Sequence, residues 1–279
     1  HEQRPARGRM TTIPLSTLDL VLAALLLIIN GWISVRLDLG LERTLAVAAA
    51  RMVVQLLLVA LVLRMLFETV SPALTALAAS VMVGFAGYEA MARQDRRLTG
   101  AWSYGLGTSA MLFAGVVVTV LALATALRPD PWFHPRYAIP LLGMVLGNTM
   151  TGVALAMERL VDTLRRDRLA VESMLALGYS RSEAFRPATR SAVRAALIPV
   201  INTMAATGLV FLPGMMTGQI LAGADPVLAV KYQMLVIFLI AGGTGLGVII
   251  AVKGVAARLS DPRHRLRLDR LAQPQRRKA

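Results

Sequence analysis

The sequence predicts an all-α polytopic membrane protein with about seven transmembrane helices. Hydrophobic residues make up 56% of its 279 residues, and charged residues only 16%. Soluble domains carry about 25% charged residues. Long uncharged stretches recur along the chain, and each approaches the roughly 20 apolar residues needed to cross a hydrocarbon core of about 30 Å. Composition and spacing therefore indicate the same class.

Seven windows account for the predicted spans. Six of them have no charged side chain: 20–35, 69–88, 101–127, 137–157, 195–224 and 232–252. The window 44–63 contains only Arg51. No small-residue cleavage site follows the first window, so we expect it to be a span and not a cleaved signal peptide.

The distribution of positive charge predicts the orientation. Four segments that would lie on one side of the membrane hold 23 of the 30 Lys and Arg residues. They are 36–51, 93–97, 159–194 and 253–279. Because Lys and Arg accumulate on the cytoplasmic side, we expect the N-terminus outside and the C-terminus in the cytoplasm of a multi-pass protein of the cell inner (plasma) membrane. Attraction to anionic membrane lipid explains the basic tail more simply than nucleic-acid binding does.

The expected organisation is an N-terminal tail over 1–14, a transmembrane domain over 15–255 and a basic cytoplasmic tail over 256–279. One segment, about 158–194, is too long for a tight turn and too patterned for a flexible linker. Leu164, Arg168 and Val171 recur there at helical spacing, which predicts an amphipathic helix.

The same segment contains signals for a helical hairpin. Gly178 stands where a helix can end with positive φ. Ser180 and Glu183 then form a capping-box pattern that starts a second helix. An interfacial connection between two spans is the simpler alternative. A partner-binding hairpin would use Arg168, Glu172, Leu175, Gly178, Tyr179, Ser180 and Glu183.

The stretch PGMMTGQILAGADP, residues 213–226, predicts a broken or re-entrant element, because its Pro and Gly residues oppose a continuous helix. Irregular backbone at membrane depth is tolerated where it is buried in protein or lines a cavity. An ordinary external loop is the alternative. With polar groups of other spans, the candidate path or gate residues are Arg51, Gln55, Asn148, Thr149, Asn202, Pro213, Gly214, Met215, Met216, Thr217 and Gln219. The polar groups in spans five and six are equally compatible with interhelical hydrogen bonds.

The sequence lacks the residues that several kinds of functional site require. The chain has no cysteine, its three histidines lie in the tails or a loop, and no metal ligand set can be assigned. It has no G-x-x-x-x-G-K-[ST] sequence to hold ATP phosphates and no paired carboxylates in mid-membrane of the kind that secondary transporters use. We therefore expect no catalytic residue and no enzyme activity in this chain, and an energy source supplied by a cytoplasmic partner.

Three stretches resemble the FetB-type permeases of ABC transporters, which include bacterial iron-export and plant aluminium-tolerance proteins. They are GNTMTGVALAMERL (147–160), VESMLALGYSRSEAF (171–185) and LPGMMTGQILAGADPVLAVKYQMLVIFLI (212–240). The resemblance covers about 15–255. It implies a permease domain that pairs with a separate ATP-binding subunit, two copies of each, with the 158–194 hairpin as the coupling helix. ATP would act through that partner, with no covalently bound cofactor.

The sequence is compatible with more than one class of substrate. The resemblance implies export of iron or another metal ion, although tight transition-metal sites use Cys, His or clustered carboxylates. A nucleotide sugar or another organic anion is the alternative, with Arg51 able to meet a phosphate. A self-contained channel or secondary carrier, which needs no ATPase, is the third hypothesis.

Overall fold

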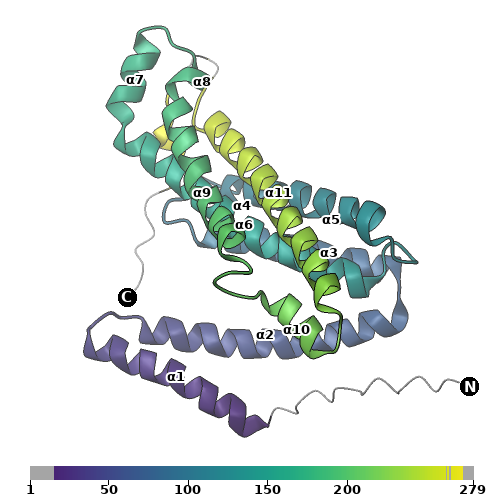
Figure 1. Ribbon diagram of the computed structural model, residues 1–279. Coiled ribbons are helices and arrows are strands. Elements are labelled where there is room, and N and C mark those ends of the chain that lie inside the picture. The colour runs from purple at the N-terminus through teal and green to yellow at the C-terminus, as the bar shows by residue number, and fades with distance from the viewer. Residues whose placement is uncertain (1–15, 262, 264, 273–279) are drawn as a thin grey trace, which may run out of the picture. The chain divides into compact units, whose positions relative to one another are not determined.

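The computed structural model describes residues 16–261, 263 and 265–272, and most of them are helical (Figure 1). The helices are α1 (Thr17–Arg36), α2 (Glu42–Thr69), α3 (Pro72–Ala92), α4 (Trp102–Met111), α5 (Val117–Ala122), α6 (Pro135–Arg166), α7 (Arg168–Ala176), α8 (Arg181–Ala184), α9 (Arg186–Ala206), α10 (Gly214–Leu221) and α11 (Pro226–Arg258). Two π-helical segments, η1 (Leu112–Val116) and η2 (Leu123–Leu127), and a 3₁₀ turn, η3 (Leu268–Arg270), complete them. Within the described residues, β-structure is limited to three isolated bridges.

Six helical stretches are long and apolar enough to cross a membrane, which confirms the all-α membrane class. They are Leu18–Arg36, Glu42–Thr69, Pro72–Ala92, Trp102–Leu127, Pro135–Arg166 and Pro226–Arg258. The count of seven and the orientation of the termini are not confirmed. The difference lies in the window 195–224, which forms no single long helix.

The window 195–224 is divided into α9 and α10 because the chain leaves the helical conformation after Ala206. Gly208 adopts a φ of 87°, which L-residues with a Cβ disfavour. Pro213 then precedes α10 and has no backbone N–H to continue a helical ladder. The predicted interruption of the helix near residue 213 is thus present in the backbone.

The described residues group into two units. Unit 1 comprises residues up to Thr69 together with Gly214–Ala229, and so contains α1, α2, α10 and the first residues of α11. In it α1 and α2 form a helical hairpin, whose turn is closed by Ser34: its hydroxyl donates to Glu42 Oε2 (2.9 Å) and accepts from Leu41 N–H (2.9 Å). Nearly all large apolar side chains of α1 and α2 are exposed, as expected of helices that face lipid.

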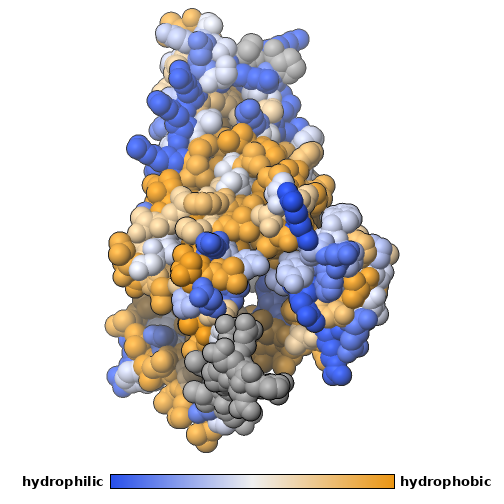
Figure 2. All heavy atoms as spheres, turned by 45° about the vertical axis from the view of Figure 1, so that its right-hand side comes forward, coloured by the Kyte–Doolittle hydropathy of each residue, from blue (hydrophilic) through white to orange (hydrophobic). Residues whose placement is uncertain are grey.

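Unit 2 comprises Val70–Pro213 and the described residues from Val230 onward. Its core forms around α6, which packs against α3, α4, α5, η1 and α9. Fully buried side chains of α6 include Val145, Val153, Met157, Leu160 and Leu164. Hydrophilic side chains gather at the end of this unit that carries α7 and α8, and hydrophobic ones cover the neighbouring surface (Figure 2).

Candidate functional site

A small polar cavity lies between three helices of unit 2. It has a volume of about 100 Å³ and is formed by α6, α9 and α11. Its lining residues are Asn148, Thr151, Gly152, Ala196, Pro199, Val200, Thr203 and Thr244. Four of these side chains carry a hydroxyl or an amide, although all lie in the uncharged windows predicted to cross the membrane.

The cavity is rich in hydrogen-bond acceptors. Asn148 Nδ2 donates to the Met144 carbonyl (2.9 Å), and Thr203 Oγ1 donates to the Pro199 carbonyl (2.9 Å). The side-chain oxygens of Asn148 and Thr203 thus retain lone pairs for a ligand. Thr244 Oγ1 is buried and has no hydrogen-bond partner among the described residues. Hydroxyl and amide oxygens of this kind are ligands for hard cations.

A positive charge stands beside the cavity. Arg93, which follows α3, donates from Nη1 to Thr151 Oγ1 at 3.4 Å. Thr151 in turn donates to the Gly147 carbonyl at 3.2 Å. This guanidinium would repel a cation that rests in the cavity and attract an anion, so Arg93 distinguishes the two substrate classes.

α6 and α11 approach each other closely beside the cavity. A Cβ added at Gly247 would lie 2.5 Å from Thr149 Cγ2, and one added at Gly152 would lie 2.7 Å from Thr244 Cγ2. Small residues allow such contacts between membrane helices. Thr149 faces this contact, whereas the predicted Asn148 lines the cavity.

The other predicted path residues lie elsewhere. Asn202 is exposed on α9, and Arg51 and Gln55 are exposed on α2 in unit 1. Gly214, Met215, Met216, Thr217 and Gln219 belong to α10, also in unit 1, and Pro213 immediately precedes them. The role of α10 and its neighbours as a gate stays a prediction. Sequence reasoning missed Thr244 and Arg93: Thr244 lies in the run GTGLG, where small residues indicate packing, and Arg93 lies outside the uncharged windows.

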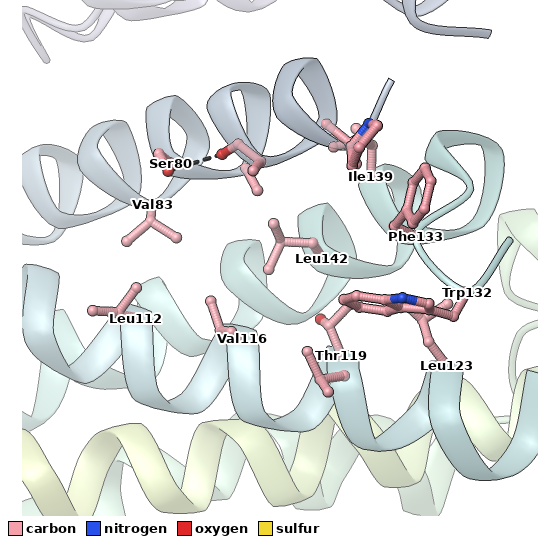
Figure 3. Close-up of a pocket in the computed structure, with 16 residues that line it drawn as sticks. Ser80, Val83, Leu112, Val116, Thr119, Leu123, Trp132, Phe133, Ile139 and Leu142 are labelled. Carbon is pink, nitrogen blue, oxygen red and sulfur yellow. Dashed lines mark hydrogen bonds between the residues drawn. The ribbon is translucent and has the colours of Figure 1, made fainter. Parts of the chain in front are cut away.

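A larger cavity of about 420 Å³ lies between α3, the η1–η2 stretch and α6 (Figure 3). Val83, Leu112, Val116 and Leu142 line it, with Trp132 and Phe133 beside them (Figure 3). This cavity is almost entirely apolar and contains none of the predicted path residues. The smaller polar cavity is therefore the better candidate for a hydrophilic substrate.

The predicted hairpin is present at the end of unit 2 (Figure 1). Gly178 ends α7 with a φ of 89°. Ser180 and Glu183 form the predicted capping box at the start of α8. The hydrogen bonds from the Ser180 hydroxyl and then its backbone N–H are the main reasons that the pKa of Glu183 is lowered.

One face of the hairpin is buried and the other is exposed. Val171 is buried, and Met174 and Leu175 pack against the core, so they anchor α7. Leu169 and Leu177 are 78% and 77% exposed, and Tyr179 is 48% exposed. Arg168 and Glu172 pair at 2.8 Å on the surface. The structure thus separates the predicted coupling residues into an anchor, which includes Leu175, and an exposed apolar tip, which includes Tyr179.

The described part of the C-terminal segment, Ser260–Ala272, forms a strap. Leu271 pairs with Leu98 in an isolated bridge, and Ala272 N–H donates to the Arg97 carbonyl at 2.8 Å. Asp261 is buried and accepts a hydrogen bond from Arg265 Nε at 3.0 Å. The sequence prediction treated this segment only as a basic tail. The alternating RLRLDRL pattern, which places leucines between charges, was the available signal.

Metal ligation has no strong site in this part of the chain. Among the described residues, no group of three or more His, Cys, Asp or Glu side chains is arranged to hold a metal ion.

The six long apolar helices define a multi-pass membrane protein. The sequence model of the uncharacterised protein family UPF0014 matches residues 17–259, and the chain belongs to this family.

Named relatives agree with this class. The chain is 32% identical over 248 residues to the "Probable iron export permease protein FetB" of Escherichia coli, covering 89% of this chain and 93% of that protein. It is 38% identical over 205 residues to the "UPF0014 membrane protein slr1647" of Synechocystis, covering 72% and 77%. It is 37% identical over 213 residues to the "UPF0014 membrane protein STAR2" of rice, covering 76% and 73%. No solved structure matches this chain.

Proposed function

We propose that this chain is the membrane permease subunit of an ABC transporter that exports iron or another metal ion from the cytoplasm. A separate ATP-binding subunit supplies the energy, and two copies of each subunit form the transporter in the cell inner membrane. The exposed apolar tip of the α7–α8 hairpin is the observation that carries this proposal.

The tip has the properties of a docking surface. Leu169 and Leu177 expose most of their side chains beside charged residues, although Val171 shows that α7 has a buried face available for leucines. Apolar groups surrounded by polar ones mark protein interaction sites. The buried face of the hairpin packs in the same core as α6 and α9. A movement of the tip would therefore be transmitted to these helices through packed side chains.

The first experiment tests the partner. The chain is co-expressed with candidate ATP-binding subunits, and both co-purification and ATPase activity are measured. We expect the Leu169→Ala/Leu177→Ala variant to retain at least about tenfold less of the ATPase subunit on co-purification. Central apolar residues of an interface commonly contribute more than about 1 kcal/mol each to binding. Its thermal stability should match that of the parent, because neither side chain is buried.

Leu39→Ala is the matched control, since Leu39 is also exposed and also lies on the predicted cytoplasmic side, between α1 and α2. The proposal fails if the tip variant retains the ATPase subunit as well as this control does. Transport by the purified chain without any ATPase would favour the channel or carrier hypothesis instead.

The cargo assignment rests on the acceptor oxygens of the polar cavity and on the names of the relatives. Thr244→Val replaces a buried hydroxyl by a methyl group of similar size. We expect it to lower stimulation of the ATPase by ferrous iron several-fold while basal activity is retained, because one ligand oxygen is lost.

Arg93 supports a second candidate cargo, a nucleotide sugar or other organic anion. For an anion, Arg93→Gln should abolish substrate stimulation, because the guanidinium would be its counter-charge. For a metal ion, the same variant should retain or increase stimulation by iron. Whether Arg93→Gln loses or keeps substrate stimulation of the ATPase therefore decides between the two cargo classes.

A further inference from the structure

A further cavity of unit 2, largely apolar but lined by cations, lies next to the hairpin, at the end of α11 and the start of α9. It has a volume of about 450 Å³, within the usual range of roughly 300–1,000 Å³ for ligand pockets. We call it the basic cavity, because Arg181, Arg186 and Lys253 line it and no carboxylate does. Its remaining lining residues are Ser182, Phe185, Thr189, Val252, Ala256 and Ala257.

One acid acts on the cations of the basic cavity. The positive charge of Arg186 is among the causes that lower the pKa of Glu183, after the hydrogen bonds from the hydroxyl and backbone N–H of Ser180. A single carboxylate beside three lining cations leaves the cavity with a net positive charge. Arg181 donates to Ser260 Oγ at 3.3 Å, which fixes one side of the cavity against the strap. A site with this excess of cations selects an anion.

The level of the cavity along α11 points to the source of that anion. Lys253 is the first charged residue after the uncharged window 232–252, so it stands where the hydrocarbon core ends. The floor of the cavity is apolar: Phe185 and Val252 are almost fully buried, and Ala256 is partly buried. Cations above an apolar floor match a lipid phosphate with its glycerol and first methylenes, and basic pockets between membrane helices bind such headgroups.

We propose that the basic cavity binds the phosphate of an anionic phospholipid, through Arg186 and Lys253 with Arg181 beside them. Bound there, the lipid bridges α8 and α9 to the end of α11. This inference does not depend on the cargo or on the ATPase.

The test measures lipid retention by native mass spectrometry of the full chain in detergent, with phosphatidylglycerol and phosphatidylcholine as probes. We expect preferential retention of phosphatidylglycerol and a rise in thermal midpoint with that lipid only. Arg186→Gln/Lys253→Gln should weaken phosphatidylglycerol binding about 25-fold, at about fivefold per cation removed. Arg190→Gln/Arg194→Gln is the control, because these α9 cations do not line the cavity. The charge-conserving variant Arg186→Lys/Lys253→Arg should bind phosphatidylglycerol as the parent does. That result would show that the weakening in Arg186→Gln/Lys253→Gln comes from the lost charge.

Three results would overturn the assignment. Equal retention of the two lipids would show that the cations do not select a headgroup. Protection by inorganic phosphate or glycerol phosphate as strong as that by phosphatidylglycerol would show a free-phosphate site. Unchanged lipid retention with loss of a co-purifying ATP-binding subunit in the double variant would show that these cations serve the protein partner.

Discussion

Single glycines determine how closely the central helices of unit 2 approach each other. Gly247 stands opposite Thr149, and Gly152 stands opposite Thr244. Thr is β-branched and stiff at χ1, so neither threonine can move aside easily for an added methyl group. The polar cavity is adjacent to this contact, because Gly152 and Thr244 belong to both.

The variant Gly247→Ala is expected to destabilise the protein by about 1–3 kcal/mol, the usual cost of overpacking a core. The new Cβ would lie 2.5 Å from Thr149 Cγ2. Gly245→Ala on the same helix is the control, because a Cβ there meets nothing within 4 Å; its stability should be unchanged or raised by less than about 1 kcal/mol. Thermal or chemical unfolding in detergent measures both. Equal stability of the two variants would contradict the close contact.

At the scale of elements, two acids stabilise the turns of the strap, because both accept hydrogen bonds from arginines of the strap itself. The pKa of Asp261 is lowered chiefly by the hydrogen bond from the Arg265 backbone N–H. The pKa of Asp269 is lowered to about 2, chiefly by its hydrogen bonds from Arg267. Because both folded pKa values lie below the ordinary 3.8, the stability they contribute is complete above that value and is lost as the pH falls through the folded pKa.

We therefore expect the strap to keep its turns at neutral pH and to loosen as the pH falls from about 4 to about 2. The distance between spin labels at Arg96→Cys and Ala272→Cys reports this, because the native chain has no cysteine. At neutral pH, Asp261→Asn should loosen the strap and raise the rate at which trypsin cleaves it at its arginines. Asp269→Asn should have a smaller effect, since its ion pair is largely exposed. A strap that trypsin cleaves equally in all three proteins would contradict this role.

The hairpin depends on both local and long-range interactions. Its cap is local, because Ser180 and Glu183 are three residues apart and satisfy each other's backbone and side-chain groups. Its anchoring is not local, because Val171 and Leu175 pack on core side chains that other helices supply. A proline at Leu175 would therefore disturb packing as well as any coupling, and the exposed Leu169 and Leu177 are the better positions to test.

At the scale of the whole molecule, the path of the chain across the membrane is the main question, and it depends on α9 and α10. Seven crossings require that these two helices together cross once. Single cysteines at Asp130, Leu177 and Ala224 test this against a membrane-impermeant thiol reagent in intact cells. We expect labelling from outside at Asp130 and Ala224, and labelling at Leu177 only after permeabilisation. Labelling of Ala224 from the cytoplasmic side would show that α9 and α10 do not complete a crossing.

The sequence alone predicted what depends on composition and on neighbours along the chain. The apolar windows became long helices, because a helix satisfies its own backbone groups wherever lipid surrounds it. Gly178, Ser180 and Glu183 ended one helix and started the next as predicted, because these interactions span only a few residues. The interruption near Pro213 was likewise visible, since proline and glycine act on their own backbone.

Tertiary structure alone decided which polar groups meet. Asn148, Thr203 and Thr244 are far apart in the sequence, and the packing of α6, α9 and α11 brings them to one cavity. Thr149, one residue from Asn148, faces the helix contact because neighbours on a helix point in different directions. The strap and the basic cavity likewise join distant segments. Local hydrogen bonding determines each helix, but side-chain packing between helices determines which face of each helix lines a site.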